Sequence, residues 1–167
     1  MQLRAAFLLP LVATSSVWAQ QVEWDKVENI RRSATEIRSI HNEKGFLGAQ
    51  EAVRICYEDA KQPGKKYGKD LEKCVTQDFV ISQTAANVFA QVSPEARRLS
   101  NSPDPDYVIQ AMSKRIVEGM IHFNVPEQDA RGLIALIKEH GLHAFANAPP
   151  LVATRVPASS DGCDRSN

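Results

Sequence analysis

The chain has 167 residues, of which 43% are hydrophobic, and its twenty Lys and Arg residues balance its twenty Asp and Glu residues. A chain of this length can form one domain with its own hydrophobic core. Its balanced charge is unlike the basic excess of nucleic-acid-binding domains, so nucleic acid is not an expected partner.

The first nineteen residues have the pattern of a secretory signal. A single positive charge, Arg4, precedes an apolar run over residues 5–12, and small residues follow up to Ala19. This order of regions is typical of a cleaved signal peptide, and the run is too short to span a bilayer. We expect cleavage after Ala19 and a periplasmic or secreted protein without a transmembrane segment; the alternative is an uncleaved anchor. Cleavage would leave nineteen basic and twenty acidic residues.

Two helices are predicted within residues 24–60. Their apolar residues recur every three or four positions with charged residues between them, which is the pattern of an amphipathic helix. Gly45 and Gly48 are expected to separate the two helices, and Pro63-Gly64 to end the second. The apolar positions are Trp24, Val27, Ile30, Ala34 and Ile37 in the first helix, and Ala49, Ala52, Val53, Cys56 and Ala60 in the second.

A third helix is predicted over residues 69–89, and three proline-containing start signals follow it. Pro94, Pro105 and Pro126 are each followed directly by an acidic residue. Proline is tolerated in the first turn of a helix, and a carboxylate there is stabilised by the helix dipole. Each of the three signals therefore predicts the start of a further helix.

These later helices are expected to be unequal in length. The first is short, to about residue 99, and the second carries an apolar stripe to Phe123. The last is predicted to stop where Gly141 adopts a left-handed conformation. The prediction is an all-α fold, an antiparallel bundle of about five main helices and one short one. One helical domain would occupy residues 20–147, and residues 148–167 would form a flexible tail.

Cys56 and Cys74 are predicted to form a disulfide between the second and third helices. Each lies four or five residues from the intervening loop, about 7 Å along its helix, so the thiols should face each other at one height. Their spacing differs from a Cys-x-x-Cys redox motif, and no histidine between residues 45 and 121 could complete a zinc site. Cys163, in the tail, is left over and is expected to be reactive or to join two chains as a dimer.

The loop between these two helices is rich in lysine. In the same span the acids are fewer, and such a cluster can attract phosphate, anionic headgroups or an acidic partner. The alternative is that these side chains only keep an exposed loop solvated. The candidate residues for an anionic-partner patch are Lys61, Lys65, Lys66, Lys69 and Lys73.

His140 and His143 are the candidates for a metal-binding pair. The sequence supplies no thiolate or carboxylate companions at a suitable spacing, so no metal is expected. Covalent haem would need a Cys-x-x-Cys-His motif, which is absent from the sequence. Non-covalent haem would need Met112 or Met120 opposite His140, but methionine on an apolar stripe is usually part of a core. We therefore expect no cofactor.

No catalytic constellation is recognisable in the sequence, which lacks, for example, a Gly-x-Ser-x-Gly motif. Asp78 lies near the apolar stripe of the third helix and, if buried, would need a partner such as the Tyr57 hydroxyl or a lysine. Gly119 interrupts a good helical pattern at a cost of about 1 kcal/mol relative to alanine, which indicates a close approach between helices.

The expected function is therefore that of a non-enzymatic binding or interaction module of the cell envelope or the secretome. Its partner would be an unknown protein or envelope component. The alternative is a carrier that holds haem, a metal or an apolar small molecule in the bundle core. A helical hydrolase, whose site the sequence does not reveal, is a third hypothesis.

Overall fold

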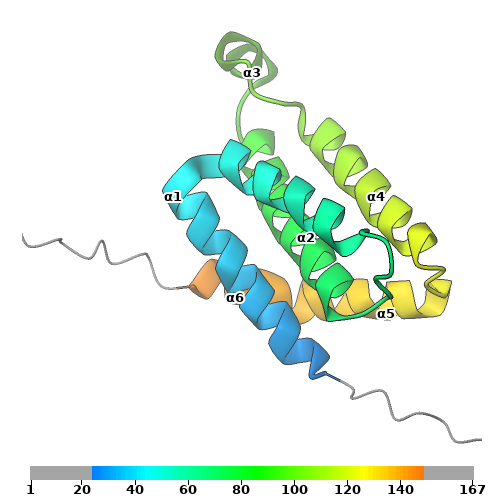
Figure 1. The fold of residues 1–167 in the computed structure, drawn as a ribbon. Helices are drawn as coiled ribbons and strands as arrows, with labels where there is room; N and C mark the ends of the chain where they lie inside the picture. The colour runs from blue at the N-terminus through cyan, green and yellow to red at the C-terminus, as the bar shows by residue number, and fades with distance from the viewer. Residues whose placement is uncertain (1–23, 149–167) are drawn as a thin grey trace, which may run out of the picture.

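The computed structural model describes residues 24–148, and its first helix is bent. α1 spans Lys26–Ala60, and Gly45 within it has a φ of 69°, a left-handed conformation that glycine adopts without strain. Figure 1 shows the chain running in different directions before and after this bend. The predicted separation of two helices at Gly45 is thus confirmed, whereas Gly48 lies inside the second segment.

α2, which spans Lys69–Ala90, is the central helix of the fold. It packs against α1 on one side and α4 on another. The disulfide predicted between Cys56 of α1 and Cys74 of α2 is confirmed, with a Cα–Cα distance of 5.5 Å. The buried apolar residues of α2 are Leu71, Cys74, Val75, Phe79, Val80, Ile81, Ala85 and Ala86.

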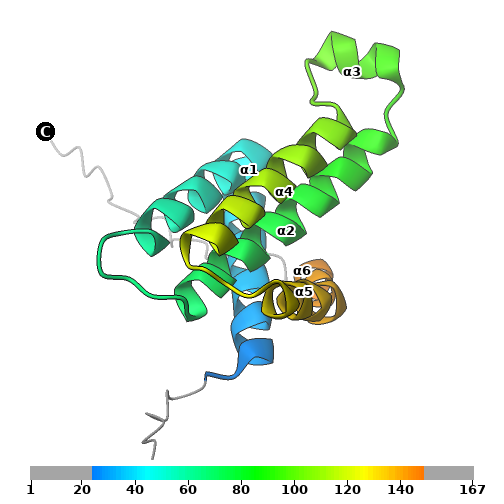
Figure 2. The same cartoon turned by 90° about the vertical axis from the view of Figure 1, so that its right-hand side faces the viewer.

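The next two helices begin at the predicted prolines. α3 spans Pro94–Ser100 and α4 spans Pro105–His122, and the side chains of Ser93 and Asp104 accept hydrogen bonds from the first-turn N–H groups. α3 buries none of its residues and lies beyond the packed helices in both views (Figures 1 and 2). α4 packs against α2. Its buried residues are Val108, Met112, Ile116, Gly119 and Met120.

The last three elements form one continuous helical segment. α5 spans Glu127–Leu136, the π-helical turn η1 spans Ile137–Gly141, and α6 spans Leu142–Asn147. The prediction that Gly141 ends the helix in a left-handed conformation is wrong, because its φ is −72° and its ψ is −48°.

The packing of Gly141 against other helices explains why a glycine occupies this position. A Cβ atom on Gly141 would lie 3.3 Å from side-chain atoms of Ile30 in α1 and of Val80 in α2. The absence of a side chain therefore lets the last helical segment pack closely against two other helices. A terminal glycine and a close-packed glycine look alike in sequence.

The predicted all-α bundle is confirmed, since every regular element within residues 24–148 is helical. Within the same range, no helix is long and apolar enough to cross a membrane. The expected signal peptide, Cys163 and nearly all of the expected tail lie outside the residues that the structure describes.

Candidate functional site

An apolar groove lies between α4 and α5 and is the candidate functional site. The two helices meet at the short loop after α4 and then diverge (Figures 1 and 2). The groove has a volume of about 580 Å³. It is lined by Ile116, Val117, Met120, Ile121, Val125, Ala130, Ile134 and Ala135, together with the charged residues Glu127, Arg131 and Lys138. We call this surface the α4–α5 groove.

The periodicity of α4 explains why the groove is apolar yet open. Ile116 and Met120 belong to the buried stripe that faces the core. Val117 and Ile121 each follow one position later, about 100° around the helix axis, where α2 does not cover them. They remain 54% and 69% exposed. Two large apolar side chains therefore face solvent beside a concave surface, an arrangement that is common at binding sites.

A second groove, of about 430 Å³, lies beside the disulfide between the two segments of α1 and α2. Both cysteines line it, but its charged residues are largely neutralised. Lys73 forms an ion pair with Glu36 at 2.7 Å, and Lys65 forms one with Asp70 at 3.0 Å. This groove is thus more polar than the α4–α5 groove, and its lysines already have acidic partners.

The five lysines of the predicted anionic-partner patch are in different environments. Lys65 and Lys73 are paired as described, and the Lys61 ammonium lies 5.4 Å from the centre of the Tyr57 ring. Lys66 and Lys69 are exposed, and neither makes an ion pair with any residue in the range 24–148. Lys66 and Lys69 are thus the two lysines of this set that have neither an acidic partner within residues 24–148 nor an aromatic ring beneath the ammonium.

Asp78 is completely buried, and its partner is Arg115 of α4. The guanidinium donates hydrogen bonds from Nε to Oδ2 at 2.9 Å and from Nη2 to Oδ1 at 2.7 Å. Ser82 donates a third to Oδ1 at 3.0 Å. Burial raises the pKa of Asp78, while the hydrogen bonds and charge of Arg115 act to lower it.

Tyr57 lies beside this pair, but its buried hydroxyl has no hydrogen-bond partner among the described residues. Burial, and then the charge of Asp78, raises the pKa of the hydroxyl well above its ordinary value. The sequence correctly indicated that Asp78 needs a partner. Arg115 was missed because a charged residue next to an apolar stripe resembles an ordinary solvent-facing residue.

Glu72 is a second buried acid, which the pattern of the sequence did not indicate. Its carboxylate accepts hydrogen bonds from Trp24 Nε1 at 2.6 Å and from the Tyr67 hydroxyl at 2.8 Å, with Lys26 at 3.8 Å. Burial and the neighbouring Glu72 raise the pKa of Tyr67. These contacts connect the start of α1 and the hairpin loop to α2.

Within residues 24–148, no further metal-ligating side chains gather around His140 and His143. His140 lies 3.7 Å from Glu139, and His143 is exposed. Residues 24–148 contain no group of three or more His, Cys, Asp or Glu residues that could hold a metal ion. Met112 and Met120 are part of the packed core.

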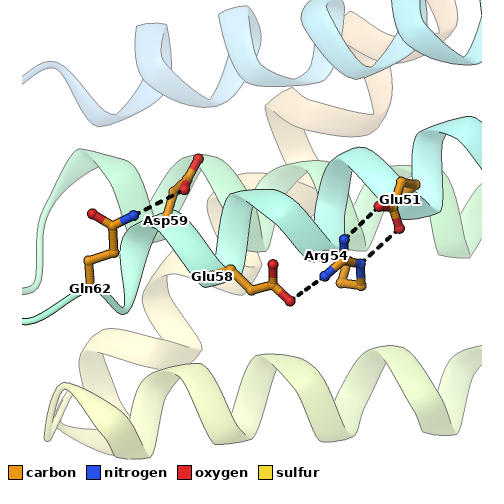
Figure 3. A network of polar contacts seen from close by, with 5 residues as sticks. All are labelled: Glu51, Arg54, Glu58, Asp59 and Gln62. Carbon is orange, nitrogen blue, oxygen red and sulfur yellow. Dashed lines mark hydrogen bonds and ion pairs between the residues drawn. The ribbon is translucent and has the colours of Figure 1, made fainter.

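The exposed face of α1 after Gly45 carries acidic and basic side chains that form ion pairs with one another. Figure 3 shows Arg54 donating hydrogen bonds to both Glu51 and Glu58, and Gln62 donating to Asp59. The hydrogen bond and the charge of Arg54 lower the pKa of Glu51. Such solvated networks of neighbouring helix positions are common on helix surfaces.

Comparisons with protein-family models, with curated proteins and with solved structures find no match to this chain.

Proposed function

We propose that this chain is a non-enzymatic binding module of the cell envelope or the secretome, and that it binds through the α4–α5 groove. The observation that carries the proposal is the exposure of Val117 and Ile121 in a concave apolar surface. Exposing such side chains to water is unfavourable, and a ligand that covers them would recover that free energy.

The Cys56–Cys74 disulfide supports the location outside the cytosol. Disulfides persist in oxidising compartments and are rare where thiols are kept reduced. The signal-like pattern of the first nineteen residues agrees with this location. A covalent link between α1 and α2 would also keep a small exported domain folded.

A small-molecule carrier is the second candidate function. Its ligand would also bind in the α4–α5 groove. The expectation from sequence was a ligand in the bundle core, where side chains such as Ile37, Val75 and Ile137 are fully buried and packed together. The volume of the α4–α5 groove lies within the range of small-molecule sites. An apolar ligand would therefore bind on the surface of the bundle.

The test uses Nile red, a neutral dye whose fluorescence rises in apolar surroundings. Val117→Asp should weaken dye binding by roughly tenfold or more, because it places a charge in an apolar site. Val88→Asp is the matched control, since Val88 on α2 is 53% exposed and Val117 is 54% exposed. Equal binding by wild-type protein and both variants would overturn the proposal, provided that circular dichroism shows all three folded.

A further inference from the structure

We propose that the α4–α5 groove binds a free, single-chain amphiphile with an anionic headgroup, such as a fatty acid. The acyl chain would lie along Val117, Ile121 and Ile134, and the headgroup would lie at Lys138. This inference rests on the proposed binding role and specifies the class of ligand.

The placement of charges around the groove supports an anionic headgroup at one end. Glu127 and Arg131, near the loop end, form an ion pair with each other and offer no net charge. Lys138 lines the opposite end and makes no ion pair with any residue in the range 24–148. An amphiphile would therefore place its apolar chain toward the loop and its anionic headgroup beside Lys138.

The length of the groove matches an acyl chain. The lining residues of the second wall run from Glu127 to Lys138, eleven positions or roughly 16 Å at 1.5 Å per residue. One acyl chain extends over half of a hydrocarbon core about 30 Å thick, or roughly 15 Å. The groove volume of about 580 Å³ is also typical of a small-molecule site.

A protein partner fits the same surface less well. A stable protein interface buries about 800 Å² and roughly 20–30 residues on each partner, whereas eleven residues line this groove and three of them are charged. Lys114 and Glu118 on α4 are exposed next to it, as are Glu127 and Arg131 on α5. An acyl chain needs only the apolar lining and one cation.

The test measures displacement of Nile red from the purified, folded full chain by sodium laurate below its micelle concentration. Laurate should displace the dye, and dodecyltrimethylammonium, which has a chain of the same length and a positive headgroup, should do so at least several-fold more weakly. Lys138→Glu should weaken laurate binding by roughly fivefold, as expected for loss of an exposed ion pair and its replacement by repulsion. The laurate affinity of each variant is calculated from its displacement curve with that variant's own Nile red dissociation constant, measured by direct titration.

Lys66→Glu is the matched control, because Lys66 is exposed and makes no ion pair with a described residue. It should bind laurate like the wild-type protein. If the two surfactants displace the dye equally, or if Lys138→Glu has no effect, the inference is overturned while the groove remains a binding site. Flotation with phosphatidylglycerol vesicles without binding of monomeric laurate would also overturn it, in favour of a membrane surface. If Val117→Asp does not weaken the binding of Nile red, the proposed function is overturned instead.

Discussion

Arg115 of α4 holds the buried carboxylate of Asp78 in α2 with two parallel hydrogen bonds, of 2.9 and 2.7 Å. The Asp78 side chain is 0% exposed and that of Arg115 is 31% exposed. This bidentate geometry joins two helices, and Ser82 donates a further hydrogen bond to the same carboxylate. The pair also fixes the position of α4 against α2. Since α4 forms one wall of the α4–α5 groove, the pair helps to hold that wall in place.

Replacement of Arg115 by methionine should destabilise the protein by about 3 kcal/mol, because it leaves the Asp78 charge buried without its partner. This destabilisation is at the lower end of the range for breaking a buried ion pair because the Arg115 side chain is partly exposed. Urea unfolding followed by circular dichroism would measure it. The double variant Asp78→Leu with Arg115→Met should recover most of the loss, and failure of the second change to restore any stability would contradict this explanation.

The Arg115→Met variant should also respond to pH in a defined direction. Removing the guanidinium removes the main effect that lowers the pKa of Asp78, so burial raises that pKa further above its unfolded value. The folded protein then binds a proton more readily than the unfolded chain does. Its free energy of unfolding should be greatest at low pH and should fall as pH rises from the unfolded pKa through the folded one.

His41 should make stability depend on pH near neutrality. Burial, and then the charge of Arg38, lowers the pKa of His41 below its ordinary value of 6.5. As the pH falls, the unfolded chain is therefore protonated first, so the contribution of neutral His41 is present above pH 6.5 and is lost below it. His41→Gln should flatten this part of the profile of unfolding free energy, measured by urea unfolding at a series of pH values; an unchanged profile would contradict this explanation.

The disulfide should contribute about 3 kcal/mol to stability, because it closes a loop of eighteen residues in the unfolded chain. The double variant Cys56→Ala with Cys74→Ala should unfold at a correspondingly lower urea concentration. Non-reducing peptide mapping of protein purified without reducing agent should recover Cys56 joined to Cys74. Alkylation of either cysteine without prior reduction would contradict the assignment.

Gly119 and Gly132 should respond in opposite directions to alanine. A Cβ atom on Gly119 would lie 3.2 Å from Leu71 Cδ1 and from Tyr57 Cε1, whereas one on Gly132 would have no atom within 4 Å. Alanine gains up to about 1 kcal/mol over glycine in a helix, but overpacking a core costs roughly 1–3 kcal/mol. Gly119→Ala should therefore lower the thermal midpoint and Gly132→Ala should raise it. A rise for both would show that the Gly119 contact relaxes.

The close approach at Gly119 was foreseen from sequence, as were the helical fold, most helix starts and the Cys56–Cys74 link. These features depend on neighbouring residues or on a short hairpin. Apolar spacing, capping side chains such as Ser93 and Asp104, and the positions of the cysteines relative to one loop are sufficient to determine them. The sequence therefore determined the local elements and one covalent constraint between them.

The role of Gly141, the partner of Asp78 and the α4–α5 groove were decided only by the tertiary structure. Each depends on the face that one helix turns toward residues far away in the chain. Gly141 lies inside a continuous helical segment, where Ile30 and Val80 leave little room for a side chain, and Arg115 reaches Asp78 across 37 positions. The groove exists because α2 covers one stripe of α4 and not the next. Helical periodicity identifies stripes, but only packing determines which stripe is buried and which remains open to a ligand.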